Sequence, residues 1–355
     1  MKPELAIVNI YQLGYHTDTY NYCIYLRNDF KITYISFHQG FENIVIEGID
    51  TVYIPQRKGF WNLIKGYLLF AKHLRHYNPD ITFLFYARFI SIVKVFGPRC
   101  HYIFDIRTGF LKDKTLVRRI WNLLLWSESL FFKSITIISE GLRKQLNIPS
   151  VKCNLLPLGG NVINGTKEFS NLNLIYIGTF DQREIHVTIE GVALFIKKYP
   201  DVLLHYDIVG YGTDIIEQQI KTAISSLSLD QEITFHGRVP YDKIDIFLKN
   251  ANIGIVYIPL KPYYDNQPST KLFEFLFAGM PVIATNTSSN RSIISDLNGI
   301  LINDNSYGFS NGLEQVYKRC RIYNSKSIRE SVSEFSWEEI VKIYLKPLLY
   351  RLLQD

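Results

Sequence analysis

Cysteine is scarce in this chain, and its spacing argues against two common kinds of site. The four cysteines stand far apart at positions 23, 100, 153 and 320, without a CxxC pair. Zinc sites and disulfide frameworks both need grouped thiols, so neither is expected. Free thiols are typical of a reducing compartment, and we therefore expect a cytoplasmic protein.

Motifs of other familiar classes are also missing. The sequence has no GxxxxGK[ST] phosphate loop and no cluster of His, Cys or carboxylate residues at metal-ligand spacing. A P-loop enzyme is therefore not supported, and catalysis without a bound metal is expected. There is no uncharged apolar run of about 18 residues, so no membrane-spanning helix is expected. The opening MKPELAIVNI enters a strand pattern directly and does not resemble a signal peptide.

The residues that are present describe a packed protein of more than one domain. Hydrophobic residues make up 47% of the 355 residues and charged residues 20%. A chain of this length is longer than one hydrophobic core usually serves, so we expect two domains of about 150 to 200 residues each. The net charge of +6 suits anionic partners such as nucleoside diphosphates or phospholipid headgroups. No motif of a nucleic-acid module occurs, and no nucleic acid is expected as a partner.

Short apolar runs alternate with amphipathic segments along the whole chain. In the first half, helices are expected near 18–28, 60–77 and 113–132, between strands such as LAIVNI, KITYIS and HYIFDI. In the second half they are expected near 184–199, 214–227 and 241–250, between strands such as NLNLIYIG, LLHYDIVG and IGIVYIP. This order is typical of parallel sheets with helices on both faces. We predict an α/β protein of two doubly wound, Rossmann-like domains that face each other across a cleft.

The domain boundaries follow from composition. The segment GGNVINGTKEFSN, near 159–171, is rich in Gly, Asn and Thr, and we interpret it as a linker. It separates a first domain over residues 1–165 from a second over residues 166–335. The last residues, 336–355, have an amphipathic pattern and are expected to form a helix.

The most informative stretch is PSTKLFEFLFAGMPVIA, at residues 268–284. Ser269 or Thr270 can cap a helix that Gly279 ends, and an apolar strand pattern follows. The N-terminus of a helix offers unpaired backbone N–H groups and a partial positive charge, which attract phosphate oxygens. Lys271 would add a full charge in the first turn. The stretch therefore predicts an anion site.

Glu274 is the one carboxylate of this stretch, among apolar neighbours. A surface carboxylate is the alternative to a functional one. The run KLFEFLFAGMPVIA resembles the donor-site signature of GT-B glycosyltransferases of family 4, the retaining group 1 enzymes. The resemblance implies that Glu274 accepts hydrogen bonds from a nucleotide ribose. In that family an acidic residue eight positions earlier meets the sugar; here Asn266 stands there, with Asp265 beside it. Which of these two residues takes that role stays open.

The resemblance implies a diphosphate contact in the loop IGTFDQREIH. Arg183 would bind the donor diphosphate there, with Gly178 and Thr179 in the same loop. A fixed guanidinium stabilises the charge that the leaving diphosphate gains, and Lys271 would share this role. The alternative is a solvated arginine at the start of a helix.

Two further segments are expected to line the nucleotide. In DIVGYGTD, Gly210 is a weak sign of a nucleotide-binding turn, and a tight turn without a ligand is the alternative. In FHGRVP, Arg238 and Val239 match a segment whose backbone, in relatives, lies against the nucleobase. Uracil is the common base of the family, so UDP is the expected nucleotide.

The first half carries fewer signals. Gly14 is the single glycine of the first loop, QLGYHTDTYNY, where hydroxyl groups could help to hold phosphate. The alternative is an ordinary turn capped by Thr17 or Asp18. In FDIRTG, Asp105 is expected to bind acceptor hydroxyls or act as a base, unless it forms a structural pair with Arg107.

Basic and aromatic residues occur together on two predicted helices of the first half. The helix near 113–132 begins with Lys and Arg and continues with Trp, Leu and Phe, and GFWNLIKGYLLFAKHLRHY has a similar composition. This combination is typical of helices that lie on anionic membranes. The alternative is that the Trp and Leu residues are part of the core.

These observations lead to one functional hypothesis. The chain is expected to transfer a hexose-type sugar, with retention, from a nucleoside diphosphate sugar to a glycan or lipid-linked glycan. Cell-surface polysaccharide synthesis at the inner face of the membrane is the expected setting, with no cofactor. The resemblance also implies that the last helix returns to the first domain. The alternatives are a nucleotide-sugar epimerase or a phosphorylase, a GT-B protein that binds nucleotide sugars without catalysis, and a membrane-recruited scaffold.

Overall fold

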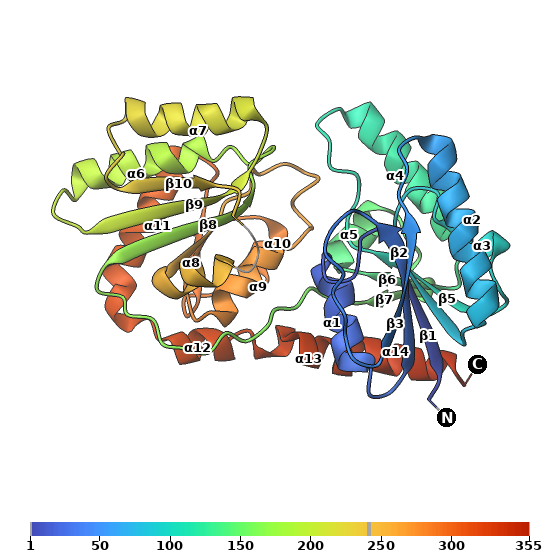
Figure 1. The fold of residues 1–355 in the computed structure, drawn as a ribbon. Coiled ribbons are helices and arrows are strands. Elements are labelled where there is room, and N and C mark those ends of the chain that lie inside the picture. Colours follow the sequence, from blue (N-terminus) through green and yellow to red (C-terminus); the bar gives the residue numbers. More distant parts are fainter. Residues whose placement is uncertain (1, 240–242, 355) are drawn as a thin grey trace. The chain divides into compact units, whose positions relative to one another are not determined.

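A computed structural model describes residues 2–239 and 243–354 (Figure 1). The chain forms two compact units. The first contains the residues up to Gly159 and those from Trp337 onward, and the second is Gly160–Ser336. Sequence analysis placed these boundaries at 165/166 and 335/336. Each unit has one parallel sheet with helices, so the predicted α/β fold class of two Rossmann-like domains is confirmed.

The first unit has a seven-stranded sheet in the order β3-β2-β1-β4-β5-β6-β7. Its elements are β1 (Glu4–Asn9), α1 (Thr17–Leu26), β2 (Lys31–His38), β3 (Ile49–Pro55), α2 (Phe60–Tyr77), β4 (Ile81–Phe85), α3 (Ser91–Phe96), β5 (His101–Ile106), α4 (Thr115–Ser129), β6 (Ser134–Ile137), α5 (Glu140–Gln145), β7 (Cys153–Leu155), α13 (Trp337–Ile340) and α14 (Lys346–Leu352). Strands β1, β4, β5 and β6 are almost entirely buried, as the apolar runs predict for a parallel sheet covered on both faces.

The second unit has a six-stranded sheet in the order β10-β9-β8-β11-β12-β13. Its elements are β8 (Leu172–Thr179), α6 (His186–Lys198), β9 (Leu204–Tyr211), α7 (Asp214–Ser226), β10 (Ile233–Gly237), α8 (Ile244–Asn250), β11 (Ile253–Val256), α9 (Thr270–Phe277), β12 (Val282–Thr285), α10 (Ser288–Arg291), β13 (Gly299–Ile302), α11 (Ser306–Arg319) and α12 (Ser325–Glu330). The expected helices near 184–199, 214–227 and 241–250 correspond to α6, α7 and α8.

The C-terminal segment packs within the first unit. Trp337 is buried, and its ring meets the ring of Tyr22 of α1 edge to face at 5.8 Å. Lys346 of α14 forms an ion pair of 2.7 Å with Asp29, which follows α1. A buried indole and an ion pair thus join the two ends of the chain, which lie near each other in Figure 1.

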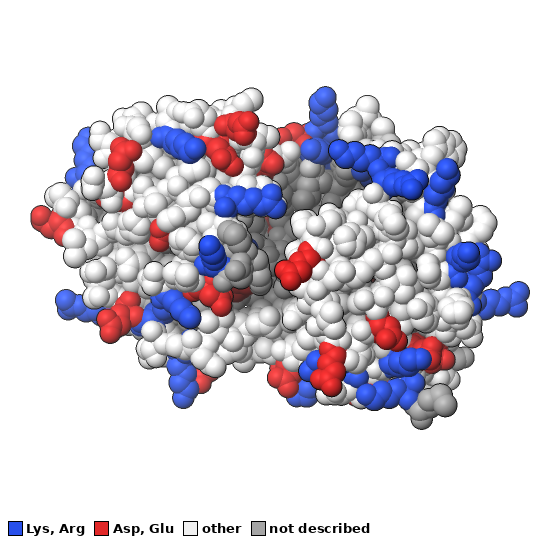
Figure 2. All heavy atoms as spheres, viewed as in Figure 1, with Lys and Arg blue, Asp and Glu red and all other residues white. Residues whose placement is uncertain are grey.

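Charge is unevenly distributed over the surface of the first unit. Figure 2 shows Lys and Arg side chains gathered over the region of α4 and α2, whereas most acidic side chains of this unit in view lie toward the chain termini. Long apolar side chains are also exposed in this region, Trp61 of α2 and Leu116 of α4 among them.

The carboxyl ends of β8 and β9 come close together at a pair of glycines. Gly178 and Gly210 are register partners, and their φ angles are +158° and +155°. A Cβ on Gly210 would lie 1.8 Å from the carbonyl oxygen of Gly178. The weak nucleotide-binding signal at Gly210 thus has a structural cause, because only glycine fits between the two strands.

Gly210→Ala is predicted to destabilise the protein by about 2 to 3 kcal/mol through this clash and its backbone strain. Gly165→Ala is the matched control, because Gly165 also has a positive φ of +131° but no atom within 4 Å of an added Cβ. The control substitution should lower the free energy of unfolding by about 1 kcal/mol. Urea denaturation of both variants measures the difference, and equal losses would contradict the steric explanation.

Candidate functional site

The second sheet has one point where the order of its strands reverses. From β8 the chain proceeds through β9 to β10 and then returns to place β11 on the other side of β8. The loops that leave β8 and β11 therefore start at neighbouring strand ends and lead to opposite sides of the sheet. Ligands of open parallel sheets bind at such points. The loop after β8 contains Arg183, and the loop after β11 leads into α9. Sequence analysis placed its main donor contacts in these two segments.

Arg183 is held by an unusual backbone. Its neighbours Gln182 and Glu184 have φ angles of +58° and +53°, which cost about 1 kcal/mol each for residues with side chains. The Arg183 guanidinium stacks on Tyr264, with Cζ 4.5 Å from the ring centre. The Tyr264 hydroxyl contacts Oε1 of Gln182 at 3.3 Å. Contacts between the two loops thus fix the position of Arg183.

One nitrogen of Arg183 is available for a ligand. Nη1 is buried and has no hydrogen-bond partner among residues 2–239 and 243–354. A buried guanidinium nitrogen without an acceptor loses free energy, and an oxygen of an anion at this point would restore the missing bond. This geometry favours an anion contact over the alternative of a solvated arginine.

The start of α9 is the second part of the site. Ser269 is the N-cap residue, as predicted, but its side chain makes no capping hydrogen bond within the described chain. Lys271 pairs with Glu274 one turn later, with Nζ 2.6 Å from Oε2. Both side chains are partly exposed, whereas their apolar neighbours are buried. Glu274 is therefore an accessible carboxylate on an otherwise buried helix, and Gly279 ends the helix with a φ of +76°, as predicted.

Asp265 is engaged in structure. Its Oδ1 accepts the backbone N–H of Ser288 at 2.8 Å, and its Oδ2 accepts the Ser288 hydroxyl at 2.7 Å. Its carbonyl oxygen accepts the N–H of Ser289. These bonds tie the loop after β11 to the first turn of α10. Asn266 is a half-buried residue in the same loop, and which of the two residues would contact the sugar stays a prediction.

The remaining predicted contacts of this unit lie at the ends of β8, β9 and β10. Thr179 is exposed at the end of β8, and its carbonyl oxygen accepts the hydroxyl of Tyr176. Arg238, after β10, stacks on Tyr211 of β9, with Cζ 4.8 Å from the ring centre. Val239 follows it, half-buried, immediately before residues 240–242, which lie outside the described structure. All three positions are at the carboxyl edge of the sheet.

In the first unit, Gly14 has a packing role. A Cβ on Gly14 would lie 2.2 Å from Cδ1 of Ile44, and its φ is +88°. The cap of α1 is His16, whose Nδ1 accepts the N–H of Thr19, and not Thr17 or Asp18 as considered from the sequence. Burial lowers the pKa of His16, which keeps this nitrogen free to accept. These contacts hold the loop in place, and a phosphate contact at Gly14 stays a prediction.

Asp105 is not exposed, as contact with the hydroxyl groups of an acceptor substrate would require. It is fully buried, and its Oδ1 accepts the hydroxyl of Thr136 at 2.7 Å. Its Oδ2 lies 3.7 Å from Nε of Arg107, which corresponds to the structural pair considered as the alternative. Arg107 itself binds Asp18 more closely, with Nε 2.6 Å from Oδ2. Burial raises the pKa of Asp105 to about 6, although Arg107 and the Thr136 hydroxyl oppose the shift.

A cavity of about 250 Å³ lies at the corresponding edge of the first sheet. It is bordered by the ends of β1, β4 and β5, where strand order also reverses, and by the inner side of α4. Its polar and aromatic lining includes Tyr11, Tyr86, Arg88, Arg107 and Trp121. Arg88 stacks on Trp121, with Cζ 4.7 Å from the ring centre. Aromatic faces beside guanidinium groups suit a ligand with both apolar and hydroxylated or anionic parts.

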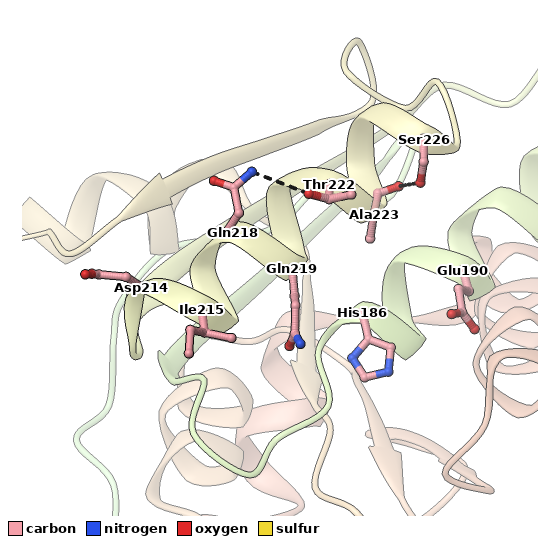
Figure 3. Close-up of a pocket in the computed structure, with 9 residues that line it drawn as sticks. All are labelled: His186, Glu190, Asp214, Ile215, Gln218, Gln219, Thr222, Ala223 and Ser226. Carbon is pink, nitrogen blue, oxygen red and sulfur yellow. Dashed lines mark hydrogen bonds between the residues drawn. The ribbon is translucent and has the colours of Figure 1, made fainter.

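A larger groove of about 850 Å³ runs between α6 and α7 (Figure 3). His186 and Gln219 point toward each other across it, whereas the neighbouring Gln218 bonds to Thr222 on its own helix. None of the residues predicted to bind the donor lines this groove. It is a surface feature of two packed helices and not part of the candidate site.

Sequence reasoning missed several residues of these sites. Tyr264 supports Arg183, and Asp18 neutralises Arg107, but neither stands in a motif that signals its role. Tyr11, Arg88 and Trp121 come from separate segments and meet only through the fold. Within the described residues there is no group of three or more His, Cys, Asp or Glu that could hold a metal ion. In the same part of the chain, no helix is long and apolar enough to cross a membrane.

The raised pKa of Asp105 predicts a pH-dependent difference in stability. Between pH 4 and 6 the folded protein binds more protons at Asp105 than the unfolded chain does, so this residue lowers stability as pH rises. Between pH 4 and pH 7 the free energy of unfolding of Asp105→Asn should therefore rise by up to about 3 kcal/mol relative to that of the wild type. Urea denaturation of both proteins at the two pH values tests this. A stability difference that does not change with pH would refute the assignment.

Comparisons with known proteins agree with the architecture. Residues 171–319 match the family described as glycosyl transferases group 1. No curated protein sequence matches the chain. Among solved structures, sucrose-phosphate synthase from Thermosynechococcus elongatus is similar, with a TM-score of 0.76 at 16% identity over 99% of each chain.

Two further structures are similar over nearly the whole chain. HepE of Anabaena, in complex with UDP and glucose, has a TM-score of 0.74 at 11% identity and covers 98% of this chain and 100% of its own. The lipopolysaccharide outer core galactosyltransferase WaaB has a TM-score of 0.71 at 14% identity, over 98% of this chain and 99% of its own. At these identities the structures establish the fold, which is GT-B. Within the second unit, residues 171–319 match the group 1 glycosyltransferase family, and the chain as a whole has the fold of these solved structures.

Proposed function

We propose that the chain transfers a sugar from a nucleoside diphosphate sugar, with UDP as the expected nucleotide, to a glycan or lipid-linked glycan acceptor. The buried Nη1 of Arg183, which has no partner among the described residues, carries this proposal, because the loop of Arg183 contacts Tyr264 in the loop that leads to the start of α9. A diphosphate would supply the missing acceptor and meet the positive end of the helix.

The geometry of Glu274 supports its proposed contact with the ribose. Lys271 holds Oε2, and Oε1 has no hydrogen-bond partner in the described part of the chain. Oε1 can therefore accept from a ribose hydroxyl while Lys271 keeps the carboxylate oriented and remains close to the phosphates. In the transition state the leaving diphosphate gains negative charge, and Arg183 and Lys271 would stabilise it.

Retention, the acceptor class and the cellular setting belong to the same proposal. Group 1 enzymes act with retention, and no pair of carboxylates among the described residues of the second unit suggests a separate covalent nucleophile. The similarity to HepE, which was solved with UDP and glucose, supports a UDP-sugar donor. The similarity to WaaB supports a role in cell-surface polysaccharide synthesis, which would occur at the cytoplasmic face of the membrane.

A second candidate is a nucleotide-sugar-binding protein without catalysis. The observation behind it is the neutral Asn266 at the position of the second acidic residue, with both oxygens of Asp265 bound to Ser288. This candidate shares the donor site and differs only in turnover.

Arg183→Ala is predicted to weaken binding of UDP by about 10- to 100-fold, because one charged hydrogen-bonding partner of the diphosphate is lost. Arg183→Lys should retain part of the affinity, since it keeps the charge but not the planar fork. Arg321→Ala removes an exposed arginine of the same unit and serves as the control. Isothermal titration calorimetry measures all three. Wild-type affinity in folded Arg183→Ala would contradict the assigned contact.

Glu274→Ala is predicted to reduce the affinity for UDP about tenfold and to leave the affinity for inorganic pyrophosphate unchanged. The difference arises because only UDP carries a ribose for Glu274 to bind. Competition titrations with both ligands separate the two contributions. Equal losses of affinity for UDP and pyrophosphate, or an unchanged affinity for UDP, would contradict the assignment of Glu274 to the ribose site.

Slow hydrolysis of the donor tests retention before any acceptor is known. After a UDP-sugar screen has identified the donor, the sugar first released should have the anomeric configuration of that donor, as time-resolved proton NMR would show. Release of the opposite anomer would overturn retention. The absence of any released sugar, together with tight UDP binding, would favour the second candidate.

A further inference from the structure

Positive charge is concentrated in one stretch of the first unit. Residues 56–133 contain fourteen Lys or Arg and four Asp or Glu, whereas the whole chain contains 39 and 33. The excess within this stretch is larger than the net charge of +6 of the whole protein, so the remainder is net acidic. Such an asymmetry is a feature of surfaces that meet an anionic partner.

The helices of this stretch lie on the same face of the first sheet. The connections from β3 to β4, from β4 to β5 and from β5 to β6 all move in the same direction along the strand order. Right-handed crossovers therefore place α2, α3 and α4 on one face, where Figure 1 shows them. Their outer sides therefore all face away from this side of the sheet.

The outer side of α4 combines apolar and basic residues. Leu116, Ile120 and Leu123 are 72%, 56% and 61% exposed, and Arg119 is exposed among them. Their spacing of three or four residues puts them on one stripe of the helix. The sequence alternative, that the large residues of this helix are core, thus holds for Leu125 on the inner side but not for this stripe.

The outer side of α2 has the same character. Trp61, Lys65, Leu68 and Lys72 are exposed at helical spacing, and the Trp61 side chain is 75% exposed. The sequence of α2 contains no acidic residue. In α4 the one acidic residue is Glu128, which is buried and accepts backbone N–H groups of Phe89 and Ser91.

We propose that this face docks on an anionic lipid bilayer. The docking face consists of seven residues from the two helices: Trp61, Lys65, Leu68, Leu116, Arg119, Ile120 and Leu123. Lys and Arg attract anionic headgroups, and Trp and Leu enter the boundary between headgroups and acyl chains. A second copy of the chain would bring two positive faces together, and a nucleic acid would leave the apolar residues uncovered.

The docking face also has a connection to the cavity of the first unit. Helix α4 presents its stripe of Leu116, Ile120 and Leu123 outward, while Trp121 and Leu125 of the same helix line the cavity. Docking would therefore hold this cavity within one helix diameter of the lipid surface, about 10 Å. If the proposed function holds, an acceptor carried on a lipid would reach the cavity without leaving the membrane.

The experiment is co-sedimentation of the full chain with phosphatidylcholine vesicles, with and without phosphatidylglycerol, in the absence of nucleotide. We expect binding only when phosphatidylglycerol is present, and weaker binding as salt is raised. Lys65→Gln combined with Arg119→Gln should weaken binding about 25-fold, or about fivefold for each charge. Trp61→Ser combined with Ile120→Ser should weaken it more than tenfold.

The matched control is Leu203→Ser combined with Ile215→Ser in the second unit, where both residues are about as exposed as Trp61, at 70% and 71%. It should bind vesicles as the wild type does, and all variants should keep the wild-type melting temperature. No binding to phosphatidylglycerol vesicles, or equal losses in the control, would overturn the proposal. So would a dimer in sedimentation velocity that Trp61→Ser dissociates, because the occupant would then be a second copy. UDP affinity should be unchanged in the docking variants, so this test is separate from that of the donor site.

Discussion

The pairing of β8 with both β9 and β11 is the constraint on which the candidate donor site depends. Because β8 lies between them, its loop and the loop after β11 leave the sheet side by side. The two loops then contact each other through Arg183 and Tyr264, and through Gln182 and the Tyr264 hydroxyl. The strain at Gln182 and Glu184 is offset by these contacts. A guanidinium nitrogen is thereby held buried, without an acceptor among the described residues.

The two units place their charges in different ways. In the second unit, Arg183, Lys271 and Glu274 are partly accessible, so they can exchange their present contacts for those of a ligand. In the first unit, Asp18, Asp105 and Arg107 are buried together at the strand ends beside the cavity, where Asp18 pairs closely with Arg107 and Asp105 lies 3.7 Å from it. Buried ion pairs of this kind specify one arrangement of the loops more than they add stability. The basic residues of α2 and α4 instead remain at the surface, where they can act on a partner.

Much of the fold could be predicted from the sequence because its signals are local. The apolar runs of parallel strands, the period of α2 and α7, and the glycine that ends α9 all act within a few residues of one another. Capping was less predictable. Ser269 is the N-cap but makes no side-chain capping bond within the described chain, and α1 is capped by His16 and not by Thr17 or Asp18, which the sequence offered as the alternative to a phosphate site, because the choice of a cap depends on how the preceding loop packs. The sequence left two roles open for Asp105 for a similar reason, since a strand-end carboxylate looks the same in sequence whether it is buried or exposed.

By itself, the sequence determined the order of strands and helices, predicted an anion site at the start of α9 and carried the resemblance to the group 1 signature around Glu274. These properties reside in residues that are neighbours along the chain. Tertiary structure alone decided that Tyr264 supports Arg183, that Ser288 engages Asp265, and that the large apolar residues of α4 divide between cavity and surface. Each of these depends on segments that are distant in sequence, and they meet only where parallel strands place their carboxyl ends along one edge.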